Sequence, residues 1–415
     1  DSSNRVALMY LGRFYERVEK LSQAEKVFRE VMQSPQYEGL VAPDLIRVLL
    51  KQQKFPGVKE VFELLLRTDP EHIVARRILS ELALGEKRYD DALEHLHAVQ
   101  ESGDASTDVR FKVALIEIEK QNYPAALREL NLVLATDPTH SEARYYLASI
   151  YAGSGRRKEA VEELMKITPE QEMYVKSRTF QAFLLRQEGN LDGAAESMRE
   201  VLSVQKGDLQ AVGYLILILR DSQKLKEAKR LLEETLEDHP ENDRLHFQLA
   251  VVLHDLGEKE RSLEVMEKVI ELNPRHSDAL NFVAYALAEK GEEMNRAETL
   301  IRRALAVRAN DGYYLDTLGW ILFRKGDFDQ AVTVLEKAVA LTGDDLVIIE
   351  HYGDALRSQG DARRALEVYR DGLGRTELAG SSDEQSQAYD RLEGKFRSVT
   401  AEHPEIRIEL PESVQ

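Results

Sequence analysis

The side chains that most often carry catalysis or bind metals are present, but they do not form a recognisable set. His95 and His97 lie two positions apart, so a helix would point them to different faces. His246 and His254 lie eight apart without a third ligand nearby. The sequence has no glycine-rich phosphate loop, no nucleophile elbow and no His-Glu-x-x-His pair, and no cysteine for thiolate chemistry. We therefore predict a protein that is not an enzyme and holds no metal and no cofactor.

The composition also limits the classes of molecule that the protein is expected to bind. The 74 acidic residues outnumber the 56 basic ones, and the net charge of −18 disfavours binding to nucleic acid or anionic lipid. No apolar run reaches the roughly 18 residues that a membrane span needs. The chain begins Asp1-Ser2-Ser3 without a methionine, so we expect a targeting segment or lipid anchor to precede it. Proteins or peptides remain as the expected partners.

Small residues recur with a fixed period. The first series consists of Ala24, Ala92, Ala126, Ala160, Ala194, Ala228, Ala297, Ala331 and Ala365. Most neighbouring intervals in this series are 34 residues, and a second series lies twelve positions earlier. Its members are Gly12, Ser80, Ala114, Ala148, Ala182, Ala250, Ala284, Gly319 and Gly353. Because small side chains let two helices approach closely, the two series predict a repeating antiparallel helical hairpin.

Glycine and proline mark the ends of the predicted helices. Glycines that tolerate left-handed dihedrals stand between the two helices of several units, for example at Gly155, Gly189 and Gly326. Pro70 and Pro138 close their units, because proline disfavours helix at the residue before it.

This pattern resembles the tetratricopeptide-repeat (TPR) family, whose unit is a helix, a turn and a helix in 34 residues. The resemblance implies an all-α fold, a right-handed superhelical solenoid of about eleven hairpins over residues 5–379. The expected units start near residues 5, 39, 73, 107, 141, 175, 209, 243, 277, 312 and 346. Unit two, with Ile46 and Val58, and unit seven, with Ile216, depart from the small-residue pattern.

A solenoid needs a cap at its end, because each unit buries its face only against neighbours. Ser382 and Gln385 fit a capping box, and an apolar face follows at Tyr389, Leu392, Phe396 and Val399. We therefore predict a capping helix over residues 382–402 and an extended tail over residues 403–415.

Positions five and nine of each first helix share one face, which lines the concave groove in this family. In the first three units these positions hold Arg13, Arg47 and Arg77. The middle and late units hold apolar and aromatic residues, and the last two add the carboxylates Asp316, Glu350 and Asp354. We predict that these three arginines and an apolar set form a protein-binding groove, and the apolar set is Phe111, Leu115, Tyr145, Phe183, Leu217, Phe247, Tyr285 and Trp320.

Two interpretations of these aromatic residues stay open. Aromatic side chains are enriched at binding hot spots, so the set favours capture of extended peptide segments. The same rings could instead pack between neighbouring first helices and only tighten the solenoid. A clamp for a partner's terminal carboxylate is disfavoured, because Asn281 has no matching lysine and asparagine at the neighbouring units.

Three segments carry a closer resemblance, at residues 279–288, 314–323 and 351–356. They resemble the C-terminal repeats of bacterial outer-membrane TPR lipoproteins that bind a carboxyl-terminal processing protease. The resemblance implies a periplasmic, outer-membrane-associated adaptor that brings cell-wall hydrolases to the protease. A structural TPR scaffold of a secretion, polysaccharide-export or pilus assembly complex is the alternative, and a cytoplasmic location stays open.

Overall fold

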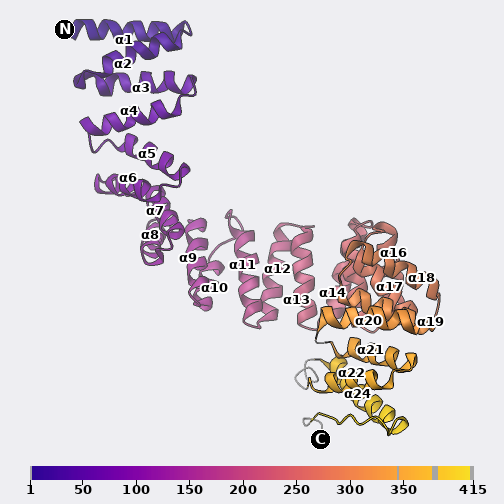
Figure 1. The fold of residues 1–415 in the computed structure, drawn as a ribbon. Helices are drawn as coiled ribbons and strands as arrows, with labels where there is room; N and C mark the ends of the chain where they lie inside the picture. The colour runs from indigo at the N-terminus through magenta and orange to yellow at the C-terminus, as the bar shows by residue number, and fades with distance from the viewer. Residues whose placement is uncertain (1, 344, 376–381, 412–415) are drawn as a thin grey trace. The chain divides into compact units, whose positions relative to one another are not determined.

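The computed structural model describes residues 2–343, 345–375 and 382–411, and within these ranges every regular element is an α-helix (Figure 1). The all-α class predicted from the sequence is confirmed. The chain divides into two compact units, Asp1–Gln205 and Lys206–Gln415, and each is described by itself.

In both units, consecutive helices pair as antiparallel hairpins that stack on one another (Figure 1). The first unit contains α1 (Ser2–Arg17), α2 (Leu21–Met32), α3 (Pro35–Lys51), α4 (Phe55–Thr68), α5 (Ile73–Gly85), α6 (Tyr89–Glu101), α7 (Thr107–Glu119), α8 (Tyr123–Thr136), α9 (Ser141–Gly153), α10 (Arg157–Met165), α11 (Tyr174–Gln187) and α12 (Leu191–Val204). The second contains α13 (Leu209–Asp221), α14 (Leu225–Asp238), α15 (Asp243–Asp255), α16 (Lys259–Leu272), α17 (Ser277–Lys290), α18 (Met294–Val307), α19 (Gly312–Lys325), α20 (Phe328–Thr342), α21 (Leu346–Gln359), α22 (Ala362–Leu373) and α24 (Asp383–Glu402).

The hairpins close over the two series of small residues, which we call the seam. All nine alanines of the first series are fully buried. At three second-series positions the close approach requires glycine, because a Cβ on Gly12, Gly319 or Gly353 would overlap a side chain of the paired helix. The side chains in the way are Phe28, Leu335 and Tyr369.

One hairpin junction departs from the repeat. α10 ends at Met165, and residues 166–173 form an irregular link before α11. The buried Arg178 guanidinium donates to the carbonyl oxygens of Leu164 and Ile167 at 2.9 and 3.1 Å. These bonds satisfy backbone groups that the shortened helix leaves without a partner.

The end of the second unit is capped by α24, which buries Leu392, Phe396 and Val399 against α21 and α22. The predicted capping box forms only in part. Ser382 accepts a bond from the Gln385 amide, but the Gln385 side chain accepts from the Leu346 amide instead of returning to Ser382. After α24, the tail packs alternate residues, Ile406, Ile408 and Leu410, against the same core.

The close helix contact at the seam predicts that an added methyl group at a seam glycine destabilises the fold. Gly353→Ala should lower the free energy of unfolding of the second unit by about 1–3 kcal/mol, as overpacking does. The new Cβ would lie 2.1 Å from a ring carbon of Tyr369. Urea titration followed by the fluorescence of Trp320, the single tryptophan, measures the loss. Gly394→Ala in α24 is the control, since nothing lies within 4 Å of its added Cβ. An equal loss of unfolding free energy in both variants would contradict the claim that the seam requires glycine at position 353.

Candidate functional site

Aromatic rings on the first helices of three successive hairpins form a ladder in the first unit. Phe111 of α7 lies 6.0 Å from Tyr146 of α9, measured between ring centroids. Tyr145, next along α9, lies 5.8 Å from Phe180 of α11, which stacks on Phe183 at 6.5 Å. The sequence pattern singled out Phe111, Tyr145 and Phe183, and it missed the two rings that link them. We call these five residues the aromatic ladder.

The ladder residues differ in how much surface they expose. Phe183 is 46% exposed, whereas Phe111, Tyr145 and Leu115 are half-buried between neighbouring helices. Burial raises the pKa of the Tyr145 hydroxyl, with the adjacent Tyr146 adding to the shift. The two interpretations left open by the sequence are therefore compatible, because the same rings pack between first helices and keep an accessible edge.

A small, mainly apolar pocket lies beside Tyr146 of the ladder. Its volume is about 240 Å³, and its lining consists mainly of apolar side chains, among them Leu84, Leu115 and Ile118, together with Lys112 and Glu119. Sites for small organic ligands measure about 300–1,000 Å³. The pocket therefore suits a single apolar side chain of a partner better than a cofactor.

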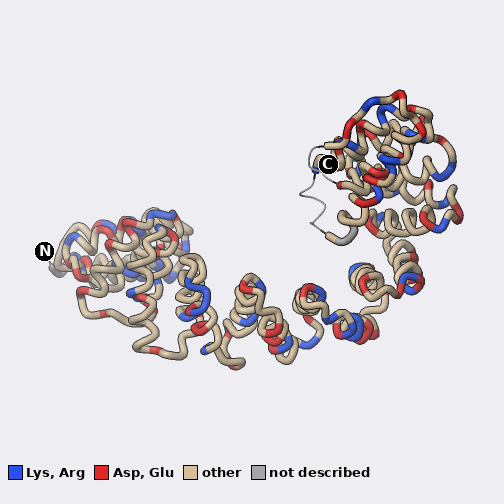
Figure 2. Tube along the Cα trace, turned by 90° about the horizontal axis from the view of Figure 1, so that it is seen from below, with Lys and Arg blue, Asp and Glu red and all other residues tan. Residues whose placement is uncertain are grey.

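The basic groove positions of the first unit are engaged in ion pairs. Arg13 donates to Asp44 at 2.7 Å, and Arg47 donates to Glu16 at 2.7 Å. Glu16 and Asp44 are buried, and the hydrogen bond from Arg47 holds the pKa of Glu16 below its usual value. Arg77 pairs with Asp104 in the same way. These arginines join neighbouring hairpins and do not form an unneutralised basic patch, and Figure 2 shows the two signs of charge interleaved.

Several side-chain contacts between neighbouring repeats join residues that are 31 positions apart in the sequence. In a 34-residue repeat, residue i has its equivalent at i+34 in the next repeat. The residue one helical turn before that equivalent, at i+31, faces residue i. A search of the sequence for opposite charges at this spacing would have found the ion pairs. The contacts are Arg13–Asp44, Glu16–Arg47, Glu81–Lys112 and Glu289–Trp320.

The second unit distributes its groove residues differently. Leu217 of α13 is 38% exposed, whereas Phe247 of α15 is half-buried with its ring 4.6 Å from His276. Tyr285 of α17 is also half-buried. Leu217 is therefore the most accessible of the predicted groove residues on α13, α15 and α17.

Trp320 of α19 is held by its neighbours on three sides. Its ring stacks on Phe323 at 5.0 Å and on His351 at 4.3 Å, and its Nε1 donates to Glu289 at 2.7 Å. His351 in turn contacts Asp316 at 2.8 Å. Trp320 is therefore a structural anchor of this unit as well as a predicted groove residue.

The carboxylates at the last groove positions bind the capping helix. Glu350 accepts from Arg391 at 2.9 Å and from Lys395 at 2.6 Å, both on α24. Asp354 pairs with Lys395 and accepts from the Tyr369 hydroxyl at 2.7 Å. The chain's own helix thus occupies the groove positions of the last hairpin.

Burial and charge shift two titrations in this cluster. Burial opposes ionisation of Glu350, but hydrogen bonds from Arg391 and Lys395 hold its pKa below the usual 4.5. Burial likewise opposes protonation of His351, but the charge of Asp316 raises its pKa above the ordinary value. Both groups are therefore stabilised in their charged forms.

The histidines have structural roles that the sequence pattern did not predict. His72, His140 and His276 precede first helices, and each accepts a bond from the backbone amide three residues on. Their positions are multiples of 34 apart, which is the signal that could have found them. Within the described ranges, no group of three or more His, Asp or Glu residues could hold a metal ion. No described helix is long and apolar enough to cross a membrane.

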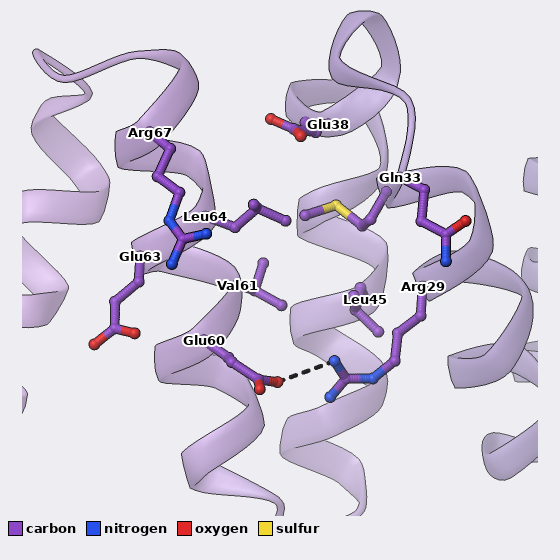
Figure 3. Close-up of a pocket in the computed structure, with 10 residues that line it drawn as sticks. Arg29, Gln33, Glu38, Leu45, Glu60, Val61, Glu63, Leu64 and Arg67 are labelled. Atoms are coloured by element: carbon purple, nitrogen blue, oxygen red, sulfur yellow. Dashed lines mark hydrogen bonds and ion pairs between the residues drawn. The ribbon is translucent and has the colours of Figure 1, made fainter.

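A cleft of about 610 Å³ opens between the second helices α2 and α4, over a floor that includes Leu45 and Val61 (Figure 3). Arg29 crosses its rim to Glu60 at 3.0 Å. The lining also contains Glu38, Glu63 and Arg67, so charges of both signs face the cleft and they do not form a site for a ligand of one charge.

A protein-family model described as "Tetratricopeptide repeat" matches residues 117–174, 185–246 and 219–284. A second model with the same description matches residues 317–383. No curated protein matches the sequence. Among solved structures, yeast Tom70 is 14% identical over 98% of each chain, with a TM-score of 0.42. A tetratricopeptide repeat protein from Parabacteroides merdae is 17% identical over 55% of this chain and 97% of its own, at 0.42. MamA from Desulfovibrio magneticus is 21% identical over 42% and 96%, at 0.36.

The Glu350 cluster predicts a pH-dependent loss of stability. Because its pKa is lowered by folding, ionised Glu350 stabilises the second unit above pH 4.5 and loses this effect as the pH falls through the folded value. Glu350→Gln should cost about 1–3 kcal/mol at pH 7 by leaving α24 cations without their partner. Urea titrations should show the gap to the parent protein shrinking below pH 4.5.

Glu234→Gln serves as the matched control, because Glu234 is exposed and pairs only loosely, at 3.6 Å, with Arg230. It should change the free energy of unfolding by less than about 0.5 kcal/mol at either pH. A pH-independent gap for Glu350→Gln would show that the ion pairs do not hold the capping helix.

Proposed function

Because the chain belongs to the tetratricopeptide-repeat family, whose repeats act as scaffolds for contacts between proteins, we propose that it is a non-catalytic adaptor that binds partner proteins through its aromatic ladder. The observation that carries the proposal is the exposed edge of that ladder. Three first helices contribute rings in contact, and Phe183 leaves nearly half of its surface to solvent. Rigid aromatic surface binds at low entropic cost, since the rings are already ordered by their neighbours.

The ladder and the adjoining pocket suit an extended peptide. The pocket beside Leu115 and Tyr146 takes one apolar side chain, and the ladder continues from it toward Phe183. An apolar residue of the partner would fill the pocket while further apolar side chains lie on the ring edges. Affinity would then come from a few apolar contacts. Because such contacts depend little on the exact sequence of the peptide, several different clients could bind.

The adaptor is proposed to work in the bacterial envelope, bringing cell-wall hydrolases to a carboxyl-terminal processing protease in the periplasm. This part of the proposal is supported by the resemblance of residues 279–288, 314–323 and 351–356, which lie on α17, α19 and α21. It would be held at the outer membrane by a lipid anchor. Such an adaptor acts by holding enzyme and substrate close together. Binding both on one protein raises their effective concentration to about the millimolar range.

Exposed apolar residues at groove positions give the test. Phe183→Ala with Leu217→Ala should weaken client binding at least about tenfold, as loss of a hot spot does. Because Phe183 and Leu217 are 46% and 38% exposed, the fold should persist with only a small loss of thermal stability. Affinity capture from an envelope extract on the immobilised chain, quantified by mass spectrometry, should recover a periplasmic protease and hydrolases, with hydrolases lost from the variant.

Phe55→Ala is the matched control, because Phe55 is 58% exposed but lies at the start of the second helix α4. It should retain both classes of protein. Recovery of one secretion, polysaccharide-export or pilus component, retained equally by all three chains, would overturn the adaptor proposal and favour a structural scaffold.

A further inference from the structure

His351 of α21 is a buried histidine held between a carboxylate and an indole ring. Its Nδ1 lies 2.8 Å from an oxygen of Asp316 on α19, and both residues are 7% exposed. Its ring stacks on Trp320 at 4.3 Å between centroids, with the two planes 17° apart. A carboxylate and the face of an indole both attract a cation, so both neighbours favour the protonated imidazole.

The charged side chains around His351 balance only when it carries a proton. This group, which we call the His351 cluster, has three carboxylates and two cations, namely Asp316, Glu350, Asp354, Arg391 and Lys395. Both cations belong to α24 and bind Glu350 and Asp354. Within the described residues, His351 is the one side chain that binds Asp316. Protonation of His351 therefore supplies the third positive charge.

Other titratable or charged side chains on the surrounding helices do not supply that charge. They are Tyr369 of α22, Glu289 of α17, Arg324 of α19, and the pairs Arg357–Glu402 of α21 and α24 and Glu336–Arg364 of α20 and α22. Tyr369 stays neutral, because burial raises the pKa of its hydroxyl far above the usual range. The remaining six are three of each sign, so their charges cancel.

We propose that His351 acts as a proton-dependent switch for the capping helix α24. With the proton bound, His351 neutralises Asp316, holds the Trp320 ring and leaves the His351 cluster without net charge. Without the proton, Asp316 becomes a buried carboxylate that lacks a cation and repels the carboxylates of α21, which is costly in a buried site. The packing of α21 then loosens, and α24 detaches more readily from Glu350 and Asp354.

The direction of the pH response follows from the same contacts. Burial opposes protonation of His351, but the charge of Asp316 raises its pKa above the ordinary 6.5. The stabilisation is therefore complete below pH 6.5 and is lost as the pH rises through the folded value. Glu350 loses its own effect in the opposite direction, as the pH falls below 4.5. The end of the second unit is consequently most stable between the two titrations.

Trp320 reports the proton on His351 directly, because a protonated imidazole in contact with an indole quenches its fluorescence. Over a pH series that crosses 6.5, the fluorescence of the folded parent protein should rise with a midpoint above this value. His351→Gln should abolish the transition, whereas His254→Gln, which removes an exposed histidine of α15, should leave it unchanged. A parent protein without the transition, or a transition that persists in His351→Gln, would overturn the proposal.

Asp316→Asn tests the charge balance while it keeps the shape of the side chain. The substitution removes one of the three carboxylates, so the His351 cluster becomes neutral with an uncharged histidine. The midpoint of the fluorescence transition should therefore fall below that of the parent protein. An unchanged midpoint would show that Asp316 does not control the proton on His351 and would reject the switch.

Thiol labelling measures the detachment of α24 itself. The chain has no cysteine, so Leu392→Cys, at a fully buried position of α24, places a single thiol that reacts when the helix detaches. Below pH 6.5 its labelling should be several-fold slower in the parent background than together with His351→Gln. The two rates should converge above the fluorescence midpoint, and their ratio at each pH removes the pH dependence of the thiol. Equal rates at every pH would overturn the link between His351 and the capping helix.

Discussion

The close contact between the two helices of each hairpin is the constraint on which the rest of this structure depends. Small residues meet there, and at Gly353 even one methyl group would overlap Tyr369. Because that contact fixes how the helices of a pair are rotated, it also fixes which residues face the neighbouring hairpin and which face solvent. The ion pairs between residues 31 positions apart and the aromatic ladder both result from this rotation, which is repeated in each hairpin.

Contacts between first helices serve stability and binding together. Arg13 and Arg47 neutralise buried carboxylates of neighbouring hairpins, and Trp320 is fixed by Glu289 and His351. The rings of the aromatic ladder are ordered in the same way before any partner arrives. Preorganised rings lose little entropy on binding, so the packing that tightens the solenoid also prepares its surface for a partner.

The capping helix is held by apolar contacts and by ion pairs together. At one end, α24 docks through Leu392 and Phe396 and through the ion pairs of Glu350, which makes the cap part of the folded core. Stacking buries a helix only where a neighbour exists, so the burial of α24 depends on its docking against α21 and α22.

Local patterns of residues predict the all-α repeat, the seam, the turns and the capping helix, because these depend on side-chain size and backbone preference within one or two neighbouring helices. They also indicate the face that carries Phe111, Tyr145 and Phe183. The exposure of each ring, the hydrogen bonds of Glu350 with α24 and the contacts of Arg178 at the irregular junction become visible in the folded structure alone. Exposure and charge pairing are set by atoms of other helices, whose distance and rotation no local pattern specifies.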